Sequence, residues 1–148
     1  MKEINKTTEK RTKKGKIVEY FFAELDTDFV RNVTVTSRNG DEEQVIALNS
    51  DGVFRFNDKR SGSVKIMRLP AIKLQVFCDL ICDMLAMEDD TEELDGSWSI
   101  LARDRYGKRY RADGFAVSFL HRPNQDPSVY LRKATGLKGM WLLDGKKL

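Results

Sequence analysis

The chain has 148 residues, of which 41% are apolar and 33% charged, and it carries a net charge of +3. This length suits a single domain with its own core, and the apolar content is too high for a wholly disordered chain. The chain contains two cysteines and no segment near the roughly 20 apolar residues that span a bilayer, which excludes a disulfide-rich scaffold and a membrane-spanning protein.

Charge is unevenly distributed along the chain. Residues 1–16 carry 7 basic and 2 acidic side chains, residues 17–100 carry 8 and 17, and residues 101–148 carry 11 and 4. Residues 1–15 have almost no apolar content, so we expect a flexible basic arm there, ahead of a single α+β domain at 16–148. The arm lacks the apolar stretch of a secretory signal, and we expect the protein to act in the cytoplasm.

Five short strands are predicted before residue 69, separated by turn residues. They are rich in β-branched and aromatic residues, and valine alternates with threonine at 33–36, which is the period of a half-buried strand. Asn39-Gly40 is a strong hairpin signal, and Gly52 and Gly62 lie in further predicted turns. We expect an antiparallel meander of the segments 17–23, 29–36, 44–48, 53–56 and 64–67.

One long amphipathic helix is predicted over about residues 70–87, with Pro70 in its first turn. Its apolar positions form two rows beside a polar stripe: Ile72, Val76, Leu80 and Met84; then Leu74, Phe77, Ile81 and Leu85; then the polar Gln75, Asp79 and Asp83. An apolar face this wide is typical of a helix that packs on a sheet. Cys78 and Cys82 lie on or beside this face, where we expect reduced, unreactive thiols.

An acidic run and a basic hairpin follow the helix. Residues 88–96 predict a solvated acidic loop, and a turn at 104–107 joins predicted strands at 98–102 and 108–114. Around this turn, cations are interleaved with aromatic residues: Arg103, Arg105, Tyr106, Lys108, Arg109, Tyr110 and Arg111. We expect Arg109 and Arg111 on one face of their strand and Tyr110 on the other. Phosphates attract cations and unpaired bases need a stacking surface, so this hairpin is the predicted site for an anionic partner.

The C-terminal part predicts one short helix. Asp126 is a suitable N-cap, Pro127 suits the first helical position, and Gly136 is expected to end the helix near Thr135. The predicted fold is therefore α+β, with about five to seven mostly antiparallel strands, the long helix packed on them and the short helix at the C-terminal end.

The sequence contains no recognisable catalytic or metal-binding constellation. His121 is the single histidine, no serine lies in a nucleophile elbow, and no glycine-rich phosphate loop is present. The first functional prediction is a non-enzymatic cytoplasmic binding module without cofactors. Its basic hairpin, assisted by the arm, would contact nucleic acid or an acidic protein. Exposed edge strands would permit a dimer, although the pattern does not require one.

Two alternatives remain open at this point. In the first, acidic side chains between residues 79 and 95 imitate nucleic-acid phosphates and block a basic groove, as in a small phage or mobile-element inhibitor of a CRISPR effector. These side chains are Asp79, Asp83, Glu88, Asp89, Asp90, Glu92 and Glu93. In the second alternative, carboxylates and a divalent ion form the site of an enzyme.

Overall fold

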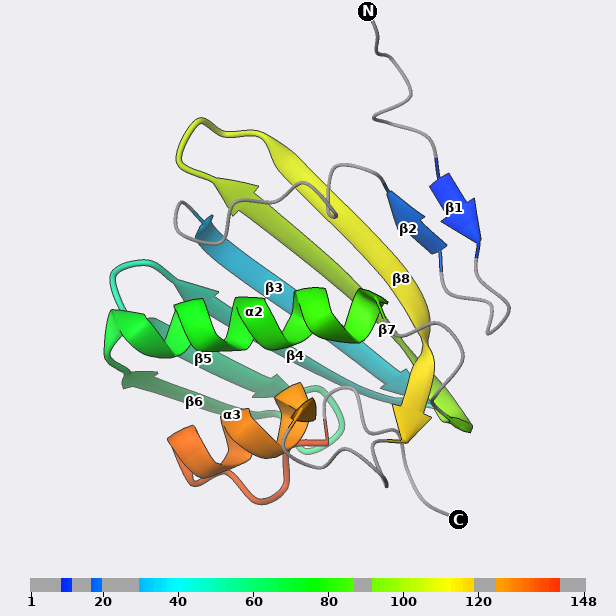
Figure 1. Ribbon diagram of the computed structural model, residues 1–148. Helices are drawn as coiled ribbons and strands as arrows, with labels where there is room; N and C mark the ends of the chain where they lie inside the picture. Colours follow the sequence, from blue (N-terminus) through cyan, green and yellow to red (C-terminus); the bar gives the residue numbers. More distant parts are fainter. Residues whose placement is uncertain (1–8, 12–16, 20–29, 87–91, 119–124, 142–148) are drawn as a thin grey trace, which may run out of the picture.

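The computed structural model describes residues 9–11, 17–19, 30–86, 92–118 and 125–141. These residues form one eight-stranded antiparallel sheet, in the order β1-β2-β8-β7-β3-β4-β5-β6, with two helices (Figure 1). The α+β class, the long helix and the short C-terminal helix are confirmed. The strands are β1 (Glu9–Arg11), β2 (Ile17–Glu19), β3 (Val30–Asn39), β4 (Glu42–Asn49), β5 (Val53–Asp58), β6 (Ser63–Arg68), β7 (Glu92–Asp104) and β8 (Arg109–Ser118).

Strands β3 to β6 form the predicted meander, but the predicted first strand is not part of it. The strand at 17–19, β2, pairs with β8 through Val18 and Ala112 rather than with β3. Strand β3 pairs with β7 instead, on the side away from β4. The expected order was therefore wrong for this strand, because local patterns identify strands but not their partners. Strand β1 lies within the predicted arm and pairs with β2, so the sheet has one strand more than the predicted range.

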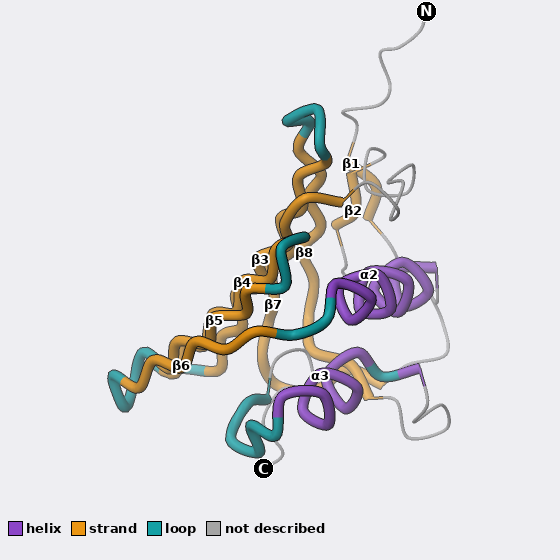
Figure 2. Tube along the Cα trace, turned by 90° about the vertical axis from the view of Figure 1, so that its left-hand side faces the viewer, coloured by secondary structure: helices purple, strands orange, loops and turns teal. Residues whose placement is uncertain are grey.

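Both helices lie on the same side of the sheet (Figure 2). Alternation along the strands turns one set of apolar side chains toward them, including the fully buried Val35, Ile46, Phe54 and Ile100. Helix α2 (Ala71–Ala86) crosses this set and completes the core. Its buried side chains are Leu74, Phe77, Cys78, Ile81 and Met84.

The predicted apolar face of α2 was too wide. Ile72 is 63% exposed, and Val76 and Leu80 are only half-buried, so of that row only Met84 is fully buried. The helix is rotated so that the row containing Leu74, Phe77 and Ile81 meets the sheet. The side chain of Leu85 lies outside the described residues.

Helix α3 (Pro127–Thr135) begins and ends as its sequence predicts. The Asp126 side chain accepts hydrogen bonds from the backbone amides of Ser128 (2.8 Å) and Val129 (3.4 Å). Gly136 adopts the left-handed conformation and its amide donates to the carbonyl oxygen of Arg132 (2.7 Å). Capping residues at both ends therefore fix the length of this helix.

Gly52 shows a close approach that only glycine permits. Its φ is +86°, and a Cβ atom there would lie 2.2 Å from the backbone oxygen of Leu69. The close approach allows the amide of Leu69 to donate a hydrogen bond to the carbonyl oxygen of Gly52 at 2.6 Å. This contact fixes the segment that leaves β6 and enters α2 against the β4–β5 turn.

A buried glutamine holds the C-terminal segment against the sheet. Gln44 of β4 is 2% exposed, its Nε2 donates to the carbonyl oxygen of Gly139 (3.0 Å), and its Oε1 accepts from the amide of Trp141 (2.9 Å). Both polar ends of the side chain are thus paired with backbone nearly one hundred residues away. The sequence offered no local signal for this contact.

Gln44→Ala is expected to lower the free energy of unfolding by about 1–3 kcal/mol, because it leaves two backbone groups of the C-terminal segment unpaired. Urea unfolding followed by tryptophan fluorescence measures the change. The exposed Gln125 is the matched control, and Gln125→Ala is expected to stay within about 0.5 kcal/mol of the parent. Equal losses in the two variants would contradict the assignment of this role to Gln44.

Candidate nucleic-acid interface

The β7–β8 hairpin ends in a short turn made by Arg105, Tyr106 and Gly107. The amide of Gly107 donates to the carbonyl oxygen of Asp104, and the amide of Asp104 donates to that of Lys108, both at 3.0 Å. Gly107 has a φ of 84°, a conformation that favours glycine after a tight turn. The predicted turn is confirmed, and its register determines which hairpin residues lie on each face of the sheet.

The carboxylate of Asp104 organises this turn. Its Oδ1 accepts hydrogen bonds from the amides of Tyr106 (2.9 Å) and Lys108 (3.0 Å), and its Oδ2 accepts from the hydroxyl of Tyr110 (2.9 Å). Burial of Asp104 opposes the charged form. The hydrogen bonds from Tyr110, Lys108 and Tyr106, together with the charge of Lys108, outweigh burial and hold the pKa of Asp104 below its usual value. The ionised side chain therefore stabilises an ordered hairpin tip.

Asp104→Asn is expected to destabilise the protein at neutral pH and to remove part of its acid sensitivity. A lowered pKa in the folded state means that the ionised carboxylate stabilises the fold above its unfolded-state pKa of about 3.9. This stabilisation is lost as the pH falls through the lower, folded-state pKa. Urea midpoints of parent and variant should therefore converge below about pH 4. A constant difference down to strongly acid pH, or the same convergence for the exposed Asp41→Asn, would contradict this role.

The two tyrosines of the predicted site lie in different environments. Tyr110 is 6% exposed and faces the helix side, where its hydroxyl contacts Asp104, so it offers no stacking surface. Tyr106 is 75% exposed at the tip. The guanidinium of Arg105 lies 5.0 Å from the centre of the Tyr106 ring, and its Nη2 donates to the Tyr106 hydroxyl at 2.8 Å. The tip therefore presents one exposed aromatic ring rather than two.

Three hairpin arginines lie on the face of the sheet opposite the helices. Arg109 and Arg111 are exposed on β8 while Tyr110 between them is buried, which confirms the predicted alternation. Arg103 is directly opposite Arg109 across the two strands. Side chains in such positions leave the sheet about 5 Å apart, and like charges there repel. The Nη2 of Arg111 forms an ion pair with Oδ2 of Asp113 at 3.0 Å.

Two further arginines share this face. Arg55 of β5 lies between the buried Phe54 and Phe56 and is therefore on the opposite side of its strand. Arg68 of β6 pairs with Val53, which is also opposite the helices because it precedes Phe54. Together these five exposed arginines form what we call the basic face: Arg55, Arg68, Arg103, Arg109 and Arg111. Arg38 of β3 also lies on this side, where it forms an ion pair with Glu43 at 2.9 Å.

Sequence reasoning missed the contribution of β5 and β6 to the basic face. Alternation with Phe54 and Phe56 placed Arg55 opposite its own buried neighbours. Only the order of the strands shows that this side of β5 continues the face presented by β7 and β8. The long separation in sequence between Arg55 and Arg103 concealed the relationship.

The acidic side chains of α2 lie on the other side of the sheet. Asp79 and Asp83 are exposed on α2, which covers the face opposite the basic face (Figure 2). Glu88, Asp89 and Asp90 lie outside the described residues. Glu92 and Glu93 are not in a loop as predicted. They begin β7 and pair with Ser118 and Val117, because β8 extends the ladder that far.

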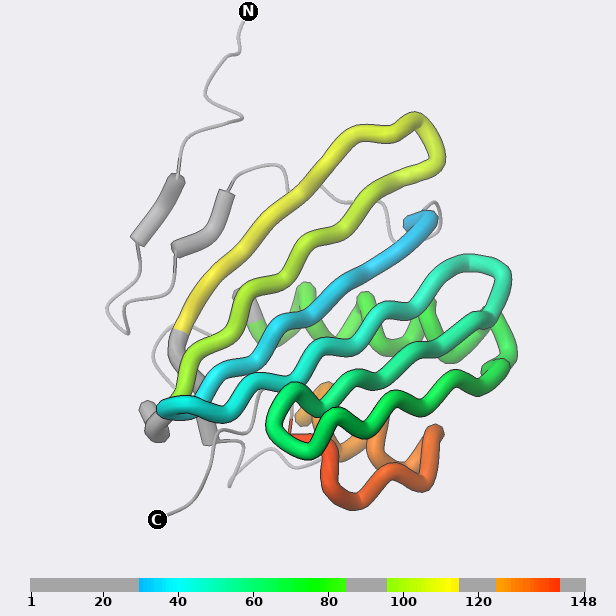
Figure 3. Tube along the Cα trace, turned by 180° about the vertical axis from the view of Figure 1, so that it is seen from behind, coloured from blue at the N-terminus to red at the C-terminus, as the bar shows by residue number. Residues whose placement is uncertain are grey.

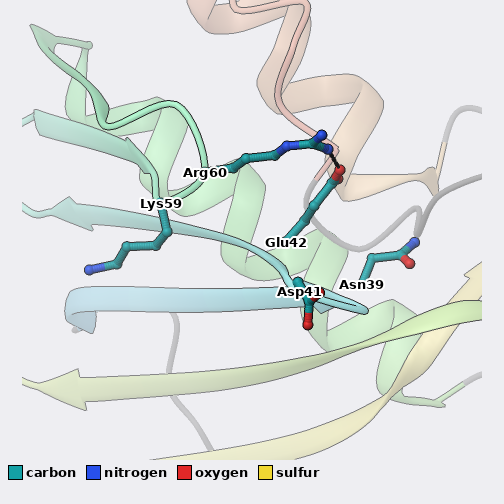
Figure 4. A pocket seen from close by; sticks show the side chains of 5 residues that line it. All are labelled: Asn39, Asp41, Glu42, Lys59 and Arg60. Carbon is teal, nitrogen blue, oxygen red and sulfur yellow. Dashed lines mark hydrogen bonds and ion pairs between the residues drawn. The ribbon is translucent and has the colours of Figure 1, made fainter.

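A polar pocket of about 410 Å³ lies between the β3–β4 and β5–β6 turns. Its walls include Asn39, Asp41, Glu42, Lys59 and Arg60. In Figure 4, Arg60 reaches across to Glu42, with which it forms an ion pair, while Lys59 points away from both. Both signs of charge meet here, whereas arginine predominates on the basic face.

The cysteines have the properties of buried thiols. Both are free, and burial, with Cys82 and Asp79 nearby, raises the pKa of Cys78. Burial, followed by the charges of Asp79 and Asp83, raises the pKa of Cys82 to about 11. Both thiols are therefore protonated at neutral pH and are poor nucleophiles. Among the described residues, no three His, Cys, Asp or Glu side chains gather as metal ligands would; His121 lies outside them.

Comparison with known proteins yields no relative: no family model, no curated protein and no solved structure matches the chain. In the part of the chain that the structure describes, no helix has the length and apolar content needed to cross a membrane. The hairpin and the basic face are therefore the features of this protein that indicate its function.

Proposed function

We propose that this protein is a cytoplasmic, non-catalytic module that binds nucleic acid through the basic face and the tip of the β7–β8 hairpin. The observation that carries the proposal is the pair Arg103 and Arg109, two exposed like charges directly opposite each other on adjacent strands. In the absence of a ligand, such a pair destabilises the sheet. A phosphate placed between the two guanidinium groups reverses the effect, because it accepts charge-assisted hydrogen bonds from both.

The separation of charge by the sheet supports the same conclusion. The arginines of the basic face lie on one side, and the exposed carboxylates of α2 lie on the other. A polyanion that approaches the helix-free side meets mainly one sign of charge, which raises its rate of association. The alternative acidic surface would use the other side of the sheet, where Asp79 and Asp83 are exposed among the side chains that the structure describes.

The spacing of the arginines favours a partner with regularly repeated charges. Adjacent strands are about 4.8 Å apart, so Arg55 on β5 lies about 14 Å across the sheet from Arg103 on β7. Nucleic acid supplies phosphates over this distance as part of its backbone. A protein partner would need acidic side chains at particular positions to do the same. The lysines of residues 1–16 would add sequence-independent attraction.

The test is a fluorescence anisotropy titration of the full chain with labelled duplex and single-stranded oligonucleotides at low and moderate salt. We expect binding that weakens steeply as salt rises, because phosphate contacts release counterions. A variant with Lys2, Lys6, Lys13 and Lys14 changed to alanine removes charge from the arm while leaving β1 in place. It is expected to keep most of the binding.

Two outcomes would count against the proposal. Loss of all binding in the arm variant would make the arm, rather than the folded domain, responsible for contact with nucleic acid. Failure of every oligonucleotide to bind at low salt would instead favour an acidic protein as the partner. Sedimentation of the same samples would test self-association through the edge strand β6, whose Val64 and Ile66 are exposed.

A further inference from the structure

The tip of the β7–β8 hairpin extends past the end of the neighbouring strand. The first residue of β3, Val30, is opposite Asp104, so residues 105–108 lie beyond the end of β3 (Figure 3). These four residues are all exposed. The hydrogen bonds to Asp104 keep the projecting segment ordered, so it is a preformed two-stranded ribbon rather than a loose loop.

We infer that this ribbon enters the major groove of a B-form DNA duplex. This inference rests on the proposed function and specifies its ligand. The major groove is about 12 Å wide and admits a two-stranded β-ribbon, whose strands are about 4.8 Å apart. Arg105, Tyr106 and Lys108 then face the base edges, where arginine is the commonest partner of guanine.

The positions of the arginines along the ribbon match the depth of this groove. Arg109 lies two residues, or about 7 Å, behind Gly107 at the tip, with Arg103 directly opposite it, and Arg111 lies about 7 Å further back. The major groove is about 8.5 Å deep. With the tip at the groove floor, Arg103 and Arg109 lie near the rim, where the phosphates are, and Arg111 lies outside the groove.

The surface fits other nucleic acids less well. Proteins that hold single strands stack successive bases on several aromatic rings, whereas Tyr106 is the exposed aromatic residue among those the structure describes. Tyr110, the second ring predicted for this purpose, is buried. Duplex RNA has a deep, narrow major groove that side chains cannot read, so a ribbon of this width would be excluded.

The experiment compares three probes of one sequence: duplex DNA, duplex RNA and single-stranded DNA. Anisotropy titrations of the full chain are expected to show at least tenfold tighter binding to duplex DNA than to either other probe. Methylation of guanine N7, which blocks the major groove, is expected to reduce duplex binding. Netropsin, which occupies the minor groove of A·T-rich sites, is expected to leave it unchanged.

A tip variant and a matched control separate insertion from general attraction. The double substitution Arg105→Ala with Tyr106→Ala is expected to weaken duplex binding at least tenfold and single-strand binding much less. Lys59→Ala is the control, because Lys59 is an exposed cation at the β5–β6 turn, at the opposite end of the sheet. It should leave both affinities within about twofold, and far-ultraviolet circular dichroism would confirm that each variant is folded.

The outcomes distinguish this inference from the proposed function. Similar affinities for all three probes, with similar losses in the tip variant, would contradict groove insertion while leaving nucleic-acid binding intact. Interference by netropsin without any effect of N7 methylation would also contradict it, by placing the contact in the minor groove. Absence of binding to every probe would contradict both proposals together.

Discussion

Replacing Arg103, Arg109 and Arg111 together by alanine is expected to weaken nucleic-acid binding by on the order of 100-fold at low salt. The three side chains leave the same face of the β7–β8 hairpin, and two of them are in direct cross-strand register. The slope of log affinity against log salt should also fall by about 3, because each phosphate contact contributes roughly one unit to it. Anisotropy titrations at several salt concentrations would measure both quantities.

A control variant with the same change of charge shows whether the position of the arginines or the net charge of the protein is responsible for binding nucleic acid. Changing Lys65, Lys133 and Lys138 to alanine also removes three exposed positive charges, but none of them belongs to the basic face. Lys65 lies on the helix side of β6 because it pairs with the buried Phe56. We expect this variant to lose only a few-fold in affinity. Equal losses in the two triple variants would show that the protein attracts nucleic acid through its overall charge alone.

Removal of the hairpin arginines is expected to leave the fold intact or slightly more stable. Arg103 and Arg109 repel each other across the strands, and relief of that repulsion offsets the loss of the exposed ion pair between Arg111 and Asp113. A functional surface commonly retains such a local conflict because the ligand resolves it. A large loss of thermal stability in the triple variant would argue instead that these arginines hold the sheet together.

Features encoded by a few neighbouring residues could be predicted from the sequence. Asp126, Pro127 and Gly136 define both ends of α3, and the structure places its caps at the expected positions. The turn around Gly107 is another example, because a residue with positive φ is needed at one place in a tight hairpin. In both cases the interactions involved span at most ten residues. The chemistry of neighbouring residues is then sufficient to predict the local structure.

Features that depend on pairing between distant segments could not be predicted. The strand pairing that places β2 beside β8, and β7 beside β3, brings together residues separated by about sixty positions or more. That strand order decides which arginines share a face. It also places the basic face and the carboxylates of α2 on opposite sides of the sheet, a question that charge counts along the chain left open.

The orientation of α2 about its own axis is a further feature that could not be predicted from the sequence. The periodicity of α2 identified two apolar rows but did not show which of them contacts the sheet. The structure buries Phe77 completely and leaves Ile72 63% exposed, although both belonged to the predicted apolar face. In the folded protein, Phe77 joins the same core cluster as Val35, Ile46 and Phe54.

This rotation leads to a large difference between two conservative truncations. Phe77→Ala is expected to lower the free energy of unfolding by about 3–5 kcal/mol, because it removes a fully buried ring and leaves a cavity between α2 and the sheet. Ile72→Ala is the matched control on the same helix. It is expected to change the free energy of unfolding by less than about 0.5 kcal/mol, because alanine favours helix and little surface is lost from the core.

Urea unfolding of the two variants, followed by far-ultraviolet circular dichroism, would measure both changes. A loss of this size is a substantial part of the roughly 5–15 kcal/mol that stabilises a domain, so Phe77→Ala should still fold but melt at a clearly lower temperature. Comparable losses in both variants would mean that α2 packs on the sheet through both apolar rows. Because the helix layer holds the sheet from the side opposite the basic face, a folded Phe77→Ala protein should still bind nucleic acid with nearly unchanged affinity.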